Sequence, residues 1–573
     1  MNRKNLTAAV LAGLAGAAGI ASSAQAVNLN PDGLGQVLIY PYYTSNDGND
    51  TLLSVVNTTD SAKAVKVRFL EGYNSREVLD FNMYMSAWDV WVAAIVDGGS
   101  VDASQAGVPH LIIPDTTCTV PYLYGDGIDA GLDFGLQEFL PYAYTGDYED
   151  GGPTDIARAS EGHFEVIEMG TLTNETETAK RLGSADAATH IFEDGKQVPA
   201  DCMQLVDNWT DFASGDDGMW LDDETLDIAR NSGGLFGGAA VVNVGKGTMH
   251  AYNARAIQGY DKDSDGNHFR PGNERPSLND GDQRTATVFF GVPQDRAVQL
   301  SYLRGVDAIS ATFMHEYIMN EYNIEAGLNA ASEWIVTFPT KNFYVDPMVT
   351  DLQSSEWQPK LDDPGCGGWI PGEPFPSRNG PFDGDSVDQD DENSNGVPDV
   401  QEDWVLCTYE EVFTVAGREP FTSVFDGEAC EAFGLEIWDR EENAGPDTPG
   451  NDRPPIVSPA PPGGSTPPEA PFELCYEVNV LRFGDGPVFG TTSDLLYTIG
   501  NAADNGWARI NFGADPDHVD WAGLVGLPVT GFWAVQYENG FLGTPEASVL
   551  ANYGGLFDHR ANTRRSYPSR SID

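Results

Sequence analysis

The sequence predicts a mainly β protein made of immunoglobulin-like β-sandwich regions with long acidic loops rich in proline and glycine. Three observations predict this class. Short apolar segments with turn residues between them recur along the chain, helical periodicity is sparse, and two stretches consist largely of Pro, Gly and acidic residues. With 573 residues, the chain is long enough for several domains and a large hydrophobic core.

The first 26 residues have the pattern of a secretory signal peptide. Arg3 and Lys4 precede an uncharged apolar run over 6–21, and the small residue Ala26 suits signal peptidase. The run is too short and too rich in Ala and Gly for a membrane-spanning helix. We therefore expect cleavage after Ala26. The remaining chain is predicted to be secreted, either extracellular, on the cell surface or in the periplasm, with no transmembrane segment.

Residues 27–347 are predicted to form an N-terminal β-sandwich region. Its clearest feature is a series of short strands separated by turn residues. In the segment 64–70, Val65, Val67 and Phe69 alternate with charged residues, which predicts a half-buried strand. A helix is expected over 311–328. The expected strands are 37–43, 52–57, 64–70, 78–85, 88–96, 164–169, 239–244, 285–290 and 334–345.

Two stretches of different composition follow. Residues 348–403 are rich in Pro, Gly and Asp, and residues 441–471 contain ten prolines. Proline lacks a backbone donor and does not fit a helix interior or a central strand, so both stretches are predicted as loops. Strands resume after 471, which predicts a C-terminal β region over 404–573 that contains the Pro-rich insertion 441–471. The expected strands are 474–483, 507–512, 525–537 and 548–553.

The charge is strongly acidic. Asp and Glu number 88 against 31 Lys and Arg, which gives a formal net charge of −57. Such a surface repels phosphate backbones, so we expect no nucleic-acid partner. Solubility in a salty habitat and neutralisation by extracellular calcium both explain the acidity, and the two explanations are compatible.

Six cysteines in an exported chain predict structural disulfides. The count is even and no Cys-x-x-Cys occurs, which disfavours zinc and thioredoxin-like sites. We expect Cys118 to pair with Cys202, because each bridge then stays within one region. The remaining four are expected to pair among themselves: Cys366, Cys407, Cys430 and Cys475.

Residues 391–402 fit a twelve-residue calcium loop. The hard Ca²⁺ ion takes six to eight oxygen ligands, and the motif supplies them at positions 1, 3, 5, 7, 9 and 12 with Gly at position 6. Pro398 disfavours an entering helix, so the segment is more typical of Asp-rich loops in extracellular repeat proteins. An acidic turn without an ion is the alternative. The expected ligands are Asp391, Asn393, Asn395, the carbonyl of Val397, Asp399 and Glu402.

A second candidate calcium turn begins at Asp261. Asp261, Asp263 and Asp265 precede Gly266 with the same initial spacing, but positions 9 and 12 of this motif are not ligands. Ion binding and an empty turn both fit this pattern.

Signatures of enzymes are sparse. No Gly-x-Ser-x-Gly occurs, and His315-Glu316 lacks the second His of a zinc-protease helix, since position 319 is Met. The segment 244–248 is expected to be a hairpin turn. Most aromatic residues fall in apparent strands and are expected in the core, although an exposed aromatic row could stack on sugars.

The segment from Gly35 to Thr44 and the strand from Trp334 to Val345 resemble uncharacterised exported β-rich surface proteins of Gram-negative bacteria. The resemblance implies a bacterial surface or extracellular setting and no particular activity.

The sequence therefore predicts a secreted, calcium-binding structural or adhesive protein of the cell surface or extracellular matrix, with surface proteins or glycans as partners. Two alternatives remain open. An extracellular polysaccharide-active hydrolase would show two carboxylates in an open, aromatic-lined cleft. A carbohydrate-binding protein would show an aromatic platform without that acid pair.

Overall fold

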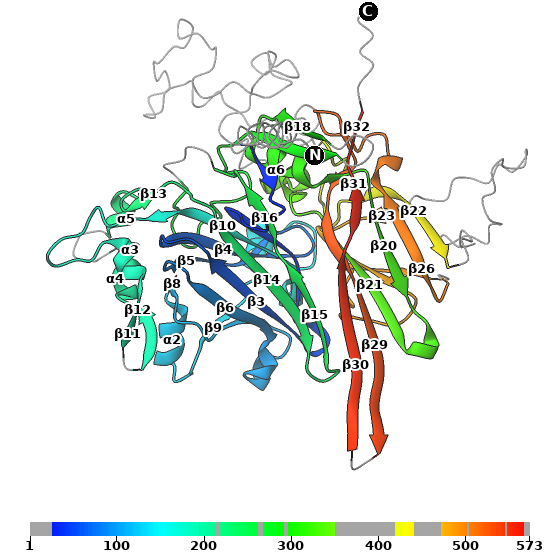
Figure 1. The fold of residues 1–573 in the computed structure, drawn as a ribbon, viewed down its shortest axis with the longest axis horizontal. Coiled ribbons are helices and arrows are strands. Elements are labelled where there is room, and N and C mark those ends of the chain that lie inside the picture. The colour runs from blue at the N-terminus through cyan, green and yellow to red at the C-terminus, as the bar shows by residue number, and fades with distance from the viewer. Residues whose placement is uncertain are drawn as a thin grey trace, which may run out of the picture.

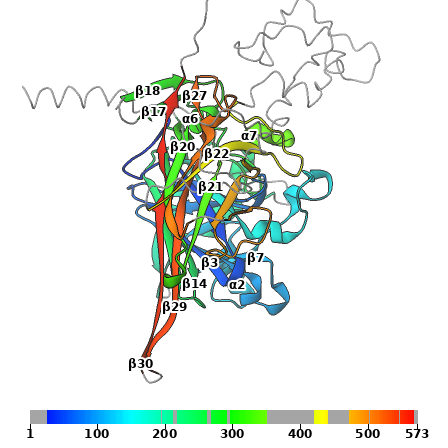
Figure 2. The same ribbon diagram turned by 90° about the vertical axis from the view of Figure 1, so that its right-hand side faces the viewer.

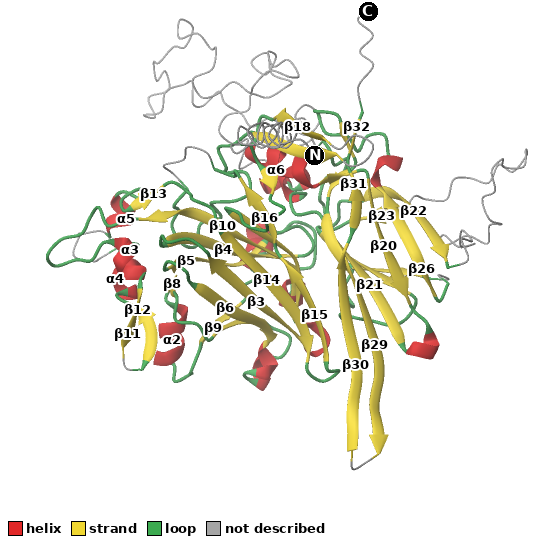
Figure 3. Cartoon of the chain, in the orientation of Figure 1, coloured by secondary structure: helices red, strands yellow, loops and turns green. Residues whose placement is uncertain are grey.

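The computed structural model describes residues 26–193, 195–211, 218–261, 267–290, 296–349, 419–440, 472–500, 503–544 and 547–566. The chain is 46% strand and 15% helix, so the prediction of a mainly β fold is confirmed (Figures 1 and 3). Among the described residues, no helix has the length and apolarity needed to cross a membrane.

Four large sheets make up most of the molecule, and the first two come from the N-terminal half. Sheet 1 has the order β1 (Asn28–Leu29), β16 (Arg255–Gln258), β2 (Val37–Thr44), β10 (Glu161–Leu172), β4 (Lys63–Glu71), β5 (Glu77–Met85) and β8 (Cys118–Val120), with β13 (Ile228–Ala229) beside β10. Sheet 2 has the order β15 (Thr248–Asn253), β14 (Leu235–Asn243), β3 (Asn49–Asn57), β6 (Val90–Asp97), β7 (Pro109–Ile113) and β9 (Gly135–Glu138).

The other two sheets combine strands from the middle and the end of the chain. Sheet 3 has the order β25 (Leu496–Ile499), β24 (Val478–Phe483), β21 (Ala330–Thr337), β29 (Thr530–Thr544) and β30 (Ala547–Asp558). Sheet 4 has the order β23 (Phe472–Leu474), β22 (Glu431–Asp439), β26 (Asn505–Asn511), β20 (Tyr317–Asn323) and β31 (Arg560–Asn562).

Sheets 1 and 2 share one hydrophobic cluster. Alternate residues of each strand point into it, among them Tyr40 and Phe164 of sheet 1 and Val55 and Trp91 of sheet 2. Tyr40 and Phe164 stack with ring centroids 4.0 Å apart. Because these side chains are fully buried, each stabilises the fold by about 1.5 to 3 kcal/mol relative to exposure.

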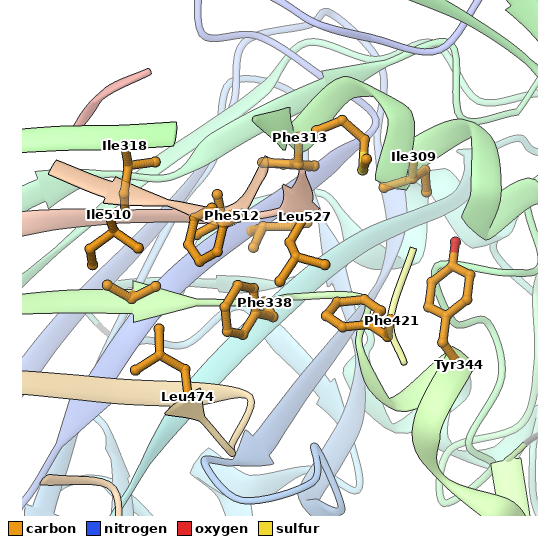
Figure 4. Close-up of a cluster of buried hydrophobic side chains, with 14 of the residues drawn as sticks. Ile309, Phe313, Ile318, Phe338, Tyr344, Phe421, Leu474, Ile510, Phe512 and Leu527 are labelled. Atoms are coloured by element: carbon orange, nitrogen blue, oxygen red, sulfur yellow. The ribbon is translucent and has the colours of Figure 1, made fainter. Parts of the chain in front are cut away.

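Sheets 3 and 4 enclose a second cluster, and the central strand of sheet 3, β21, is buried on both faces. Trp334 of β21 packs into the cluster shared with sheet 4, whereas the next residue, Ile335, packs into the cluster shared with sheets 1 and 2. Figure 4 shows part of the second cluster, where Ile318 and Ile510 of sheet 4 lie near Phe338 and Leu527. The two sandwiches are therefore joined through sheet 3.

The remaining elements are short. Helix α6 (Gly305–Phe313) packs near β17 (Thr285–Phe290), which pairs with β18 (Arg296–Ser301). The other helices are α2 (Leu123–Asp129), α3 (Ser184–Ala188), α4 (Cys202–Asp207), α5 (Met219–Asp222) and α7 (Asn342–Val345). The other two-stranded pairs are β11 (His190–Glu193) with β12 (Lys196–Pro199), β19 (Met314–His315) with β28 (Leu527–Pro528), and β27 (Leu524–Val525) with β32 (Arg564–Arg565).

Several finer predictions differ from the structure. The helix predicted over 311–328 is wrong beyond Phe313, because the segment from Tyr317 to Asn323 pairs with both β26 and β31. The strand predicted over 334–345 ends at Thr337. Sheets 1 and 2 are larger than the four- and three-stranded sheets of a constant-type immunoglobulin domain, so the immunoglobulin-like part of the prediction is not confirmed. The boundary predicted after residue 347 falls between strands that share sheets 3 and 4.

Strand β4 corrects another expectation, since all of it is buried rather than one face. Lys63 pairs with Glu168 at 2.6 Å, and Lys66 pairs with Asp80. Arg68 contacts Glu77 at 2.8 Å and Glu165 at 3.1 Å. The basic residues of β4 are therefore buried in ion pairs on both faces of the strand.

Two disulfides join distant segments. Cys118 bonds to Cys202, as predicted, and connects β8 to α4. Cys430 bonds to Cys475 across a separation of 45 residues. The other two cysteines, Cys366 and Cys407, lie outside the described residues. The predicted hairpin turn at 244–248 is confirmed, because Asn243 pairs with Thr248.

Candidate interaction surface

Most of the predicted calcium ligands lie outside the described residues. These are Asp391, Asn393, Asn395, Val397, Asp399 and Glu402 of the first motif, and Asp263 and Asp265 of the second. Calcium binding at both motifs therefore stays a prediction.

Asp261 is the described member of the second motif, and it is buried at the edge of sheet 1. Its Oδ2 accepts hydrogen bonds from the side-chain amides of Asn231 at 3.2 Å and Asn267 at 2.9 Å. Its backbone N–H donates to Gln36 Oε1 at 3.0 Å, and its carbonyl accepts from Gln36 Nε2 at 3.2 Å. Backbone and side chain of Asp261 are thus held in place at the beginning of the acidic turn.

Another buried acid–base pair consists of His518 and Glu431. His518 Nε2 lies 3.0 Å from Glu431 Oε2, and both side chains are shielded from solvent. The Glu431 contact raises the pKa of His518 against the opposing effect of burial. Within the described ranges, the one group with metal-like spacing is Glu428, Cys430 and Cys475. Its two sulfurs form a disulfide and offer no thiolate ligand.

The outward face of sheet 2 is apolar and exposed. Alternation along β3, β6, β14 and β15 sends one set of side chains into the core and the other into solvent. Leu52 is 46% exposed and Met249 is 57% exposed. The other large apolar side chains exposed on this face are Val90, Val92 and Phe236. We call this set the apolar sheet face.

Charge is nearly absent from the apolar sheet face. The strand register places Leu52 beside Ala94 and Ala240, and Ser54 beside Val92 and Gly238. Among the outward positions of β3, β6, β14 and β15, Asp50 is the one charged residue, and burial is the main cause that raises its pKa. In a chain of net charge −57, such a surface is an exception, and contiguous apolar patches commonly mark interaction sites.

A second exposed apolar feature is the distal half of the β29–β30 hairpin. The pairing of β21 with β29 ends at Tyr537, whereas the β29–β30 ladder continues to Thr544 and Ala547. In both views the hairpin extends beyond the rest of the described chain (Figures 1 and 2). We call residues 538–552 the hairpin arm.

The hairpin arm presents apolar side chains to solvent. Phe541 is 73% exposed and Val549 is 68% exposed, and Leu542 is more than half exposed. The arm holds two charged residues, Glu538 and Glu546. An isolated two-stranded hairpin is at best marginally stable in water, and exposed apolar strand edges favour pairing with another chain. The arm therefore exposes apolar side chains and strand edges that no other sheet of the described chain supports.

The base of the arm is attached to the edge of sheet 2. Asn552 Nδ2 donates to the carbonyl of Lys246 at 2.6 Å, and the Gly555 carbonyl lies 3.3 Å from His250 Nδ1. Gly247 has a φ of +70°, and a Cβ at this position would lie 2.3 Å from Leu550 Cδ2. The turn between β14 and β15 therefore requires glycine, and it sets the position of the arm relative to the apolar sheet face.

Sequence reasoning found the strands of this surface but not the surface itself. It predicted strands near β3, β6, β14 and β30, and it gave no reason to leave one apolar face uncovered. A usable signal was the pair Phe541-Leu542, which follows Gly540 beyond the expected end of a strand. No protein-family model, curated protein or solved structure matches the chain.

Proposed function

We propose that the protein is a structural or adhesive protein of the cell surface or extracellular matrix that acts by contact with further copies of itself. The observation that carries the proposal is the pairing of a charge-poor apolar sheet face with an apolar hairpin arm on a chain of net charge −57. Two such chains repel each other over most of their surfaces, but not where carboxylates are missing.

Charge argues for a second copy as the occupant. At physiological ionic strength the Debye length is about 8 Å, so charges outside the contact are partly screened. Apolar surface then dominates at the contact, at about 25 cal/mol per Å² buried. The chain itself supplies two surfaces of matching character, since the outward positions of the sheet face and the exposed residues of the arm both lack charge almost entirely.

Area explains why both surfaces are needed. Four strands at ~4.8 Å spacing and seven residues at ~3.3 Å per residue give the sheet face roughly 450 Å². A stable interface buries about 800 Å² on each partner. The hairpin arm, apolar on both sides, would supply the remainder by lying against the sheet face of a neighbouring copy.

The proposed setting is an oxidising space outside the cytoplasm, in keeping with a secreted protein of bacterial origin. The two disulfides support this setting, because such bridges persist in secreted and periplasmic proteins. Immunoglobulin-like architecture remains a proposal at the level of the individual sandwich regions.

Calcium is the second part of the proposal. Ca²⁺ bound by the loop from Asp391 to Glu402 would neutralise acidic residues in the segment between β21 and β22. Treatment of the purified chain with EGTA should lower its melting temperature and accelerate protease cleavage within 348–403. The double variant Asp391→Ala and Glu402→Ala should abolish this response. An unchanged melting temperature and cleavage rate after EGTA would remove calcium from the proposal.

Self-association is tested by sedimentation velocity over a range of protein concentrations. The wild-type chain should form dimers or larger species, and Val92→Glu or Phe541→Glu should weaken association at least tenfold. Phe192→Glu is the matched control, because Phe192 on β11 is 72% exposed but lies outside both surfaces. A monomeric wild type at every concentration, or equal weakening by Phe192→Glu, would refute the proposal.

A further inference from the structure

The outward face of sheet 4 carries a stack of aromatic and guanidinium groups. Trp438 of β22 and Trp507 of β26 are direct cross-strand neighbours, and their rings lie 4.0 Å apart at an interplanar angle of 13°. Arg509 follows on the same side of β26. Its guanidinium carbon lies 5.5 Å from the ring centroid of Trp438 and 5.3 Å from that of Tyr317. The four side chains form a layered row.

Core packing does not account for this row. On the opposite side of β26, Ala508 and Ile510 are fully buried in the cluster between sheets 3 and 4. Trp507 is 37% exposed, and Trp438 and Tyr317 are half-buried. The stacking holds the indoles in a set orientation at the surface, and such preorganisation lowers the entropic cost of binding a ligand.

Polar groups surround the indoles on the same face. Arg509 forms an ion pair with Glu436, which is its cross-strand neighbour on β22. Glu321 of β20 lies directly opposite Trp507 and is exposed. Arg560 of β31 lies opposite Met319 of β20, which separates it from Arg509, and is also exposed. The face thus combines a flat apolar surface with charged hydrogen-bonding groups of both signs.

We propose that this face of sheet 4 binds carbohydrate, with the exposed surface of Trp507 stacked on a pyranose ring. One side of a pyranose is lined with C–H groups and suits an indole face, whereas its hydroxyls radiate at the ring edge. Glu321 accepts hydrogen bonds from such hydroxyls, and Arg509 and Glu436 provide a donor and an acceptor next to the stack.

The charge selects a class of polysaccharide. Near the indoles, the positive charges of Arg509 and Arg560 are matched by the negative charges of Glu436 and Glu321, and the whole chain carries −57. Chains rich in uronate or sulfate would be repelled over most of the molecule. The ligand is therefore a neutral polymer of hexose or N-acetylhexosamine units. This inference is independent of self-association, because the hairpin arm and the apolar sheet face take no part in it.

Retention on insoluble cellulose, chitin and granular starch tests the inference with the full chain. The wild type should be retained by at least one of the three polymers, and Trp507→Ala should weaken that binding at least tenfold. Trp521→Ala is the matched control, since Trp521 is 56% exposed but lies outside sheet 4. Retention of the wild type by none of the polymers, or equal losses in both variants, would overturn the assignment.

A second measurement requires no variant and so does not depend on correct folding of Trp507→Ala. N-bromosuccinimide oxidises exposed tryptophans, and peptide mass mapping locates the product. The retaining polymer should protect Trp507 several-fold and leave Trp521 unprotected; equal oxidation of Trp507 with and without the polymer would contradict stacking. Phe541→Glu should leave retention unchanged while it weakens association, which separates this test from that of the proposed function.

Discussion

The outward face of sheet 1 is covered by other parts of the chain, whereas the outward face of sheet 2 is exposed. The outward face of β4 carries Lys66 and Arg68, and both are buried in ion pairs. The outward face of β3 and β6 carries Leu52 and Val92, and both are exposed. Alternation along a strand shows on which face of the sheet a residue lies. Whether that residue is buried depends on the segments that cover the face.

The cover over sheet 1 comes from the segment that follows residue 266. The Phe269 carbonyl accepts a hydrogen bond from Asn82 Nδ2 at 2.8 Å, and the Gly272 N–H donates to Asp80 Oδ2 at 3.0 Å. His268 Nε2 lies 3.0 Å from the Tyr84 hydroxyl. No described segment covers the apolar sheet face in the same way, which is why we assign that face to a partner.

The largest effect should follow from breaking a buried ion pair. Lys63→Ala leaves Glu168 buried without its cation and should lower the free energy of unfolding by about 3 to 5 kcal/mol. Lys246→Ala is the control, because the Lys246–Asp47 pair is partly exposed and should contribute about 0 to 1 kcal/mol. Urea denaturation at pH 7 measures both. Similar losses for the two variants would show that the Lys63–Glu168 pair is not shielded from water.

A second prediction concerns the pH dependence of stability. Burial raises the pKa of Glu165 to about 7, against the opposing effect of Arg68, whereas an unfolded Glu titrates near 4.3. The folded state therefore binds this proton more tightly, so its contribution to stability is present at low pH and is lost as pH rises from about 4.5 to 7.

Glu165→Gln should remove that contribution, which is on the order of 3 kcal/mol across this window. Urea denaturation of both proteins at several pH values between 4.5 and 8 provides the test. If the free energy of unfolding depends on pH in the same way for the wild type and the variant, Glu165 lies in a hydrated environment, contrary to its burial.

The smallest effect is expected on the apolar sheet face. Val92→Thr keeps a β-branched side chain on an exposed strand position and should change the free energy of unfolding of the monomer by less than about 0.5 kcal/mol. Val55→Thr places a hydroxyl in the core of the same sheet and should cost about 1 to 3 kcal/mol. Thermal melts at low protein concentration compare the two, and equal losses would mean that Val92 is covered within one molecule.

The sequence predicted strands and turns better than it predicted which faces of the sheets are covered. It placed strands close to β2, β3, β4 and β5, because alternation and turn residues are local signals. It also predicted the Cys118–Cys202 bridge, because both cysteines fall within one predicted region. It did not predict that Lys66 and Arg68 are buried, because their partners on β5 and β10 and the covering segment become neighbours only in the folded chain.

The wrong helix over 311–328 has a related cause. Its Met, Glu and Ala residues suit a helix, yet the pairing of Tyr317–Asn323 with β26 and β31 outweighs this propensity. Strand aromatics were predicted to pack in the core. This prediction holds for Tyr40, Trp91 and Trp334 and is wrong for Trp507, because one face of β26 is open to solvent. The sequence did not indicate the apolar sheet face with its hairpin arm or the aromatic face of sheet 4. Neither surface has residues at a fixed spacing, which is what identified the predicted calcium ligands.

Two neighbouring residues of one strand, Trp334 and Ile335, point into different hydrophobic clusters. A force that separates the two sandwiches would have to break the side-chain packing on one face of sheet 3 while the other face remains packed. Sheet 3 is therefore a rigid connection between them and not a flexible linker. Load applied to sheets 1 and 2 therefore reaches sheet 4 through the side chains on the two faces of β21.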